Sequence, residues 1–81
     1  MARHLESILW LWAATLSRRS AKGWEVADLV AQGLSYDAAA TRLGISQSAV
    51  SQRAAAAGLV EEQRARELAE ATLACFLEET P

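Results

Sequence analysis

Apolar positions recur at helical spacing along almost the whole chain, and short polar breaks separate the helical stretches. The first stretch, residues 3–19, places five apolar side chains within an arc of about 100° at 3.6 residues per turn. These side chains are Leu5, Ile8, Leu9, Trp12 and Leu16. Four further stretches, 22–32, 36–43, 47–57 and 60–79, are bounded by the serines and glycines that favour helix ends. The pattern predicts an all-α, five-helix fold in a single domain, residues 1–81.

Two short helical runs, 36–43 and 47–57, flank a tight break in the middle of the chain. Gly44 follows the first run, where glycine adopts a positive φ without steric cost. Ser46 stands at the N-cap position of the second run, and Gly58 ends that run as Gly44 ends the first. A helix, a glycine turn and a capped helix of these lengths predict a helix-turn-helix.

The second run has one narrow apolar side, because Ala54 and Ala57 continue the stripe of Val50 at i+4 and i+7. Its other side carries four short, uncharged polar residues, Gln47, Ser48, Ser51 and Gln52. Such side chains can hydrogen-bond to base edges in a major groove, and glutamine can pair with adenine through two hydrogen bonds. Arg42 and Arg53 flank this surface and can reach phosphates. The pattern therefore favours double-stranded DNA as the partner.

The segment GISQSAVSQR, residues 44–53, is similar to the helix-turn-helix of bacterial transcription regulators. It most resembles the tetrahelical type of sigma-factor region 4 and of response-regulator DNA-binding domains, whose pattern of LGIS, polar pair, small residue, Val, polar pair and Arg is matched by residues 43–53. The resemblance implies base contacts from Gln47, Ser48, Ser51 and Gln52, and DNA-backbone contacts from Thr41, Arg42, Ser46 and Arg53. Ala54 departs from the family, which usually has a larger aliphatic residue there, so another helix must fill the core at this point.

The resemblance also covers the preceding residues, because the family braces its helix-turn-helix with one more helix, here 22–32. We expect that helix to pack through Trp24, Ala27, Leu29, Val30 and Ala31. The stretch from SRRSAKGW to residue 58 resembles helix-turn-helix tails attached to larger bacterial regulators, with the SatD type as a candidate. On this resemblance we expect the chain to be a domain of a longer regulator.

The alternative to a DNA-binding function is a protein-interaction or dimerisation domain that keeps the helix-turn-helix only as a scaffold.

Charge is unevenly distributed along the 81 residues, whose formal net charge is −2. The first 24 residues carry four cations and one carboxylate, whereas residues 61–81 carry six glutamates and two arginines. The negative charge therefore lies in the last helix, where it can face away from a phosphate backbone, although few cations remain for tight binding by one copy. At the junction after the first helix, Arg18, Arg19 and Lys22 either touch the DNA backbone or lie in a solvated loop, and Ser20 is a candidate cap.

Trp10 and Leu11 lie outside the apolar stripe of the first helix, and Trp10 points about 160° away from Trp12. One small core cannot receive both indoles, so we expect a homodimer in which the long first and last helices pack together across the interface. The residues expected there are Trp10, Leu11, Leu73, Phe76 and Leu77. The alternative is that Trp10 lies under the last helix of its own chain.

Other classes of function find little support. Cys75 is the only cysteine, so no intrachain disulfide can form; we expect it to be a small buried group in a cytoplasmic protein. His4 is the only histidine, and neither a metal cluster, a cofactor site nor a catalytic constellation can be drawn. The apolar run 8–16 is too short to span a bilayer. Glu6 before it and SRRS after it do not fit a signal peptide, so no membrane partner is expected.

Overall fold

The computed structural model describes residues 2–79, and within this range the chain is all-α, without strands. Its helices are α1 (Ala2–Ser17), α2 (Ala21–Ala31), α3 (Tyr36–Leu43), α4 (Gln47–Ala56) and α5 (Leu59–Glu79). Each end lies within two residues of the position predicted from the sequence. The prediction of an all-helical chain with five helices is confirmed for the described residues.

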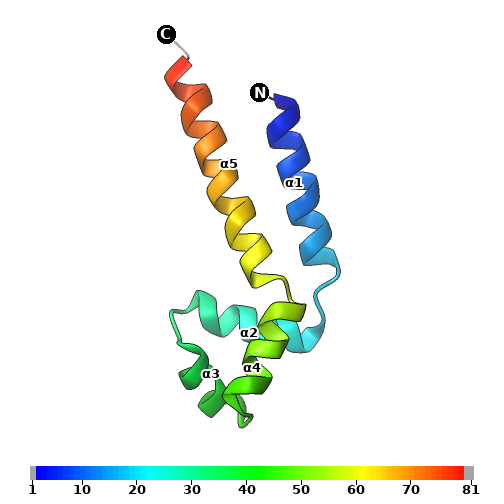
Figure 1. Ribbon diagram of the computed structural model, residues 1–81, viewed down its shortest axis with the longest axis vertical. Helices are drawn as coiled ribbons and strands as arrows, with labels where there is room; N and C mark the ends of the chain where they lie inside the picture. The colour runs from blue at the N-terminus through cyan, green and yellow to red at the C-terminus, as the bar shows by residue number, and fades with distance from the viewer. Residues whose placement is uncertain (1, 80–81) are drawn as a thin grey trace.

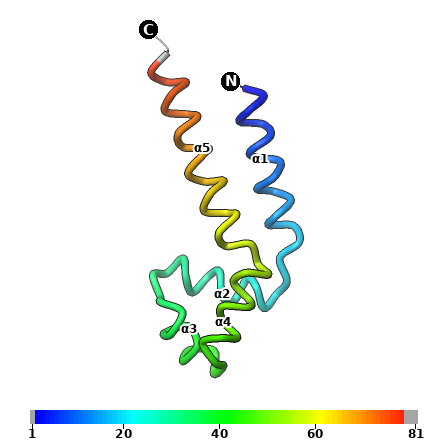
Figure 2. Tube along the Cα trace, viewed as in Figure 1, coloured from blue at the N-terminus to red at the C-terminus, as the bar shows by residue number. Residues whose placement is uncertain are grey.

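The helices form two parts, a head and a stalk (Figure 1). The head consists of α2, α3 and α4. The stalk consists of α1 and α5, which pack against each other in antiparallel directions and project from the head. Their 16 and 21 residues correspond to lengths of about 24 and 31 Å. The beginning of α1 and the end of α5 consequently lie together at the far end of the stalk (Figure 2).

This arrangement makes the molecule elongated. Its extents are 52 × 22 × 15 Å and its radius of gyration is 15.4 Å. A compact chain of this length would have a radius of gyration of about 12 Å. The stalk therefore reaches well beyond the core of the head. Only the start of α5 also packs against α4, and the main neighbour of α1 and α5 is the other stalk helix.

The core of the head is small and rich in alanine. Val26 and Val50 have no exposed surface, and Leu29, Ala39, Ala40 and Ala54 complete the buried cluster. Partly buried side chains surround it: Val30, Leu34, Tyr36, Leu43, Ile45 and Leu59. The cluster that contains Ala54 also holds Leu29 from α2, and Leu59 from α5 packs against it, so helices other than α4 supply larger apolar side chains to this core.

The buried face of α2 differs from the expected one. Val26 is fully buried although it was not among the expected packing residues, whereas Trp24 is 41% exposed and Ala31 is exposed. The cause is helical geometry, because residues two positions apart point to nearly opposite sides of a helix. Once Val26 and Leu29 face α3 and α4, Trp24 must turn away from them.

Serine caps begin three of the helices. The Oγ atoms of Ser20, Ser35 and Ser46 accept hydrogen bonds from the backbone N–H groups of Gly23, Ala38 and Ala49, with lengths of 3.1, 3.1 and 3.0 Å. These bonds satisfy donors that a helix leaves unpaired at its start. The expected caps are confirmed.

The stalk leaves much of its apolar surface in solvent. Leu9 is 49% exposed, although it belongs to the predicted stripe, and Cys75 is exposed, contrary to the prediction of a small buried group. Trp10 is 70% exposed, so it does not lie under α5. The reason is that a two-helix stalk can bury only the side of each helix that faces the other.

None of the helices in residues 2–79 combines the length and apolar character needed to cross a bilayer.

Candidate nucleic-acid interface

The turn between α3 and α4 is defined by its backbone hydrogen bonds. Gly44 has φ +69° and ψ 33°, and its N–H donates to the carbonyl of Thr41 at 3.3 Å. The next N–H, that of Ile45, donates to the carbonyl of Ala40 at 3.1 Å. These bonds satisfy the last carbonyls of α3 and direct the chain into α4 at a fixed angle. Glycine is required by this left-handed backbone and not by space, since a Cβ added at Gly44 would meet no atom within 4 Å.

One side of α4 is buried against the rest of the head. Val50, Ala54 and Ala57, its C-cap, retain 0, 3 and 3% of their surface, and α4 packs against α2, α3 and α5. Short side chains at two of these three positions allow close approach of the neighbouring helices. The rotation of α4 about its own axis is thereby fixed.

The opposite side of α4 is a polar face, which we define as Gln47, Ser48, Ser51 and Gln52. All four residues are exposed, and they span an arc of about 140° on the helix. The structure thus brings the four expected base-contacting residues together on one surface. Uncharged amides and hydroxyls on an open helix face are suited to hydrogen bonding with base edges.

The expected backbone-contacting residues lie at the end of α3 and along α4. Thr41, Arg42 and Ser46 are exposed, whereas Arg53 is half-buried. Thr41 already donates from Oγ1 to the carbonyl of Asp37 at 3.3 Å, and the hydroxyl oxygen of Ser46 accepts the cap bond. The charged residues of α3 and α4 are these two arginines and Asp37, so this part of the head carries one excess positive charge.

Arg19 is neither a phosphate-facing cation nor part of a solvated loop, which corrects both expectations for this residue. It is 8% exposed, and its Nε donates to the carbonyl of Ala57 at 2.9 Å. Its Nη2 donates to Oε1 of Glu62 at 2.9 Å, and its guanidinium stacks 4.6 Å from the ring centre of Trp24. Arg19 therefore joins the end of α4 to the first turn of α5.

Glu62 completes this arrangement, which we call the Arg19 cluster. Its Oε2 accepts hydrogen bonds from Nε1 of Trp12 at 3.1 Å and from Nη2 of Arg66 at 3.4 Å, while Arg66 lies 5.1 Å from the ring centre of Trp12. Burial alone would raise the pKa of Glu62, but the hydrogen bonds from Arg19 and Trp12 and the positive charges of Arg19 and Arg66 outweigh it, so its pKa is lowered.

Sequence patterns did not predict this cluster. Glu61 and Glu62 both lie in the first turn of α5, where a carboxylate is favoured by the helix macrodipole and needs no distant partner. Arg19 and Glu62 are 43 positions apart, and no local spacing rule connects them. Within the junction Arg18 and Ser20 are exposed and only Arg19 is buried, so its neighbours in the sequence gave no signal of this role.

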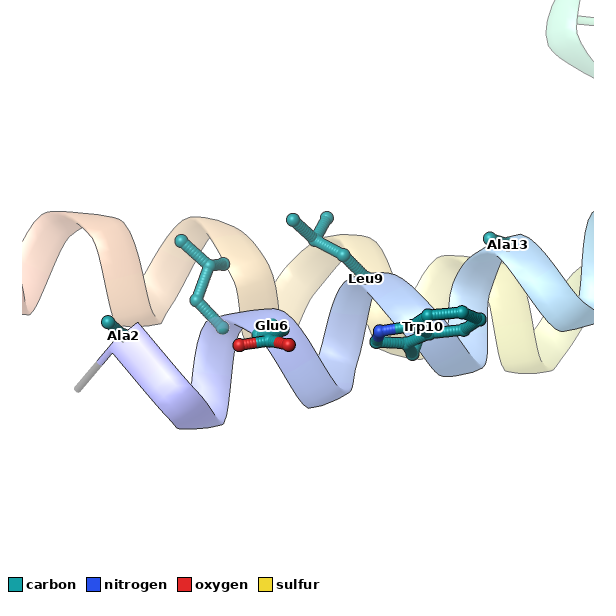
Figure 3. A pocket seen from close by; sticks show the side chains of 6 residues that line it. Ala2, Glu6, Leu9, Trp10 and Ala13 are labelled. Atoms are coloured by element: carbon teal, nitrogen blue, oxygen red, sulfur yellow. The ribbon is translucent and has the colours of Figure 1, made fainter.

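The exposed apolar residues of the stalk line separate hollows. Trp10 lines one with Leu5 and Leu9, and all of its labelled side chains project from α1, with α5 running behind (Figure 3). Leu5 also lines an adjoining hollow with Leu73 and Phe76 from α5. Leu11 lines a different groove, which includes Val60, Arg64 and Leu68. Three of the five expected dimer-interface residues therefore line two hollows that share Leu5, and Leu11 lines a separate groove.

Leu77, the fifth expected interface residue, is 68% exposed at the far end of α5.

A comparison of the chain with protein-family models, curated proteins and solved structures finds no match. Among residues 2–79, no three His, Cys, Asp or Glu side chains gather in a group that could hold a metal ion. The geometry of the head and the stalk is therefore what points to a function.

Proposed function

We propose that this chain is a helix-turn-helix DNA-binding domain of the tetrahelical type that serves in transcription regulation. In this proposal α3 and α4 are the two helices of the motif, and α4 enters the major groove of double-stranded DNA. The observation that carries the proposal is the polar face of α4, exposed as a whole while Val50, Ala54 and Ala57 hold the opposite side in the core. A rigidly held helix with an open row of hydrogen-bonding groups suits base recognition.

The polar face and its flanking cations would divide the work of binding. Gln47 and Gln52 can each pair with an adenine through two hydrogen bonds, which would read sequence. Arg42 and Arg53 can contact phosphates, which would fix the position of α4 without reading sequence. Thr41 and Ser46 are exposed near the start of α4 and can add neutral backbone contacts.

The acidic net charge is compatible with this proposal because of where the carboxylates lie. Glu67, Glu70 and Glu78 belong to α5, which leads away from the head (Figure 1). With two cations beside the polar face, one head would release few counterions, and the logarithm of the binding constant would fall with the logarithm of salt concentration with a slope of only about −2. A single head would then bind weakly, and two linked heads would bind far more tightly.

The test begins with selection of bound sites from random double-stranded DNA, followed by fluorescence-anisotropy titrations. Gln52→Ala is expected to lose about 1–3 kcal/mol on the selected site and to relax preference at one base pair, whereas Arg53→Ala weakens selected and unselected DNA alike. Gln32→Ala is the matched control, because Gln32 is an exposed glutamine outside α4 and should leave binding unchanged. Equal affinity of all four proteins would contradict the proposal.

A protein-interaction or dimerisation domain is the second candidate, and the stalk is the observation that favours it. Trp10 and Leu77 are 70 and 68% exposed, and exposed apolar surface of this kind marks interaction sites. The two candidates differ in one simple measurement. A pure interaction domain would form concentration-dependent oligomers but show no salt-dependent retention on DNA.

A further inference from the structure

We propose that the far half of the stalk docks a second copy of this chain, side by side and in the same direction, so that both heads lie at one end. The docking surface, which we call the distal surface, consists of Leu5, Leu9, Trp10, Leu73, Phe76 and Leu77. The direction of pairing rests on the proposed DNA-binding function, whereas the surface itself rests on the geometry of the stalk.

The distal surface is large enough for a stable dimer. Trp10 is 70% exposed and Phe76 is 50% exposed, and an aromatic side chain can bury about 150–250 Å². Leu9, Leu73 and Leu77 add further exposed apolar area, at 49, 45 and 68%. Together these side chains offer several hundred Å², on the order of the roughly 800 Å² per partner that a standard interface buries.

A second copy fits this surface better than a single peptide, because the stalk is half of a helical bundle. In the stalk, α1 and α5 cover one side of each other, and apolar side chains remain on the outer sides of both helices. Two more helices of matching length would enclose them, as in a four-helix bundle. A second stalk supplies both helices at once, and a two-fold axis places the same surface on both partners.

Parallel pairing follows from where the heads must be. The Arg19 cluster ties the end of α4 to α5 and α1, so the head keeps one orientation on its stalk. Parallel stalks would place two α4 helices at the same end, where they could read half-sites about 34 Å apart. Antiparallel stalks joined by their far ends would separate the heads by more than the 52 Å length of one molecule.

Dimerisation and DNA binding should respond differently to salt. Glu6 lies in the hollow beside Leu9 and Trp10, and Glu70 and Glu78 are exposed on α5. Arg3 is also exposed and precedes Trp10 by seven residues on the same face of α1, so charges of both signs border the distal surface. Because apolar burial drives the pairing, raising the salt concentration should change dimerisation far less than it weakens binding to DNA.

Sedimentation equilibrium on the full chain, with and without added sodium chloride, tests the surface. Trp10→Glu should abolish the dimer, and Leu11→Glu is the matched control, since Leu11 is also 70% exposed on α1 but lies in the other groove. Circular dichroism should show the same helix content in all three proteins, because both substituted side chains are exposed. A monomeric wild type, or dissociation caused by Leu11→Glu and not by Trp10→Glu, would overturn the proposal.

Electron–electron spin distances test the direction of pairing. Ser48→Cys, combined with Cys75→Ser, carries one nitroxide on the exposed side of each head. A distance near 34 Å supports parallel stalks, and a distance beyond 52 Å overturns them. These readouts need no DNA, so a dimer that passes both tests but does not bind DNA would refute the proposed function alone.

Discussion

Arg19 and Glu62 form an ion pair with an Nη2–Oε1 distance of 2.9 Å, and the side chain of Arg19 is 1% exposed. The same guanidinium donates from Nε to the carbonyl of Ala57, the C-cap of α4. A buried arginine needs both partners, because an uncompensated charge or unpaired donor away from water is costly. The pair consequently ties the end of α4 to the base of the stalk, and the orientation of the head depends on it.

The first prediction concerns the strength of this pair. Glu62→Gln should lower the free energy of unfolding by about 2 kcal/mol, because it leaves the Arg19 charge without a counter-charge. The expected loss is smaller than the roughly 3–5 kcal/mol of a fully buried pair, because Glu62 remains 19% exposed and the amide still accepts hydrogen bonds. Urea unfolding at one fixed protein concentration measures it. Glu61→Gln, an exposed neighbour, should change stability by less than about 0.5 kcal/mol.

The second prediction concerns pH. The pKa of Glu62 is lower in the folded chain than its usual value of 4.5, so its contribution to stability is present above that value and is lost as the pH falls through the folded pKa. The difference in stability between the wild type and Glu62→Gln should therefore be constant at neutral pH and shrink below about pH 4.5. Urea titrations of both proteins across this range give the difference directly. A difference that grows on acidification would contradict the lowered pKa.

The third prediction concerns Gly58, where α4 meets α5. Its φ is +72°, and an added Cβ would lie 2.6 Å from Cγ2 of Thr15 on α1. Gly58→Ala should therefore destabilise the fold by more than Gly44→Ala, whose φ is also positive but whose surroundings are open, and which should lose only about 1–2 kcal/mol of backbone strain. Thr15→Ser removes the clashing methyl and keeps the hydroxyl, so it should rescue part of the loss in the double variant. Equal losses for the two alanine variants would show that α1 moves away from position 58 without a cost in stability.

The helices and their caps could be predicted from the sequence because local rules determine them. Gly44, Ser35 and Ser46 each act within four residues of their own position, and the apolar stripe of α4 follows from helical periodicity alone. The exposure of the polar face follows as well, since the core side of so short a helix leaves the other side in solvent.

The remaining features depend on contacts between distant parts of the chain. Val26 was missed because the rotation of α2 is chosen by α3 and α4, and Arg19 was misplaced because its partners, Ala57 and Glu62, lie 38 and 43 residues away. The exposure of Cys75 was missed for the same reason, because it depends on which side of α5 packs against α1. Periodicity shows that α5 has an apolar face, but not that a second helix of the same chain covers only part of it.

The last prediction separates the structural and the DNA-contacting roles of two serines near the start of α4. Ser46→Ala removes the hydroxyl that accepts from the N–H of Ala49 and should cost about 1 kcal/mol of stability. Ser48→Ala removes an exposed hydroxyl from the polar face and should leave stability within about 0.5 kcal/mol of the wild type.

Base preference in DNA binding should respond in the opposite way from stability: it should change with Ser48→Ala and not with Ser46→Ala. Ser48→Ala should alter base preference at one position, because its exposed hydroxyl can meet a base edge, whereas Ser46→Ala should weaken selected and unselected DNA to the same degree. Thermal or urea unfolding and anisotropy titrations on the same two proteins provide both readouts. If Ser48→Ala left the affinity and the base preference intact while Ser46→Ala lost stability as expected, the cap would stand and the polar face would not be the surface that reads DNA.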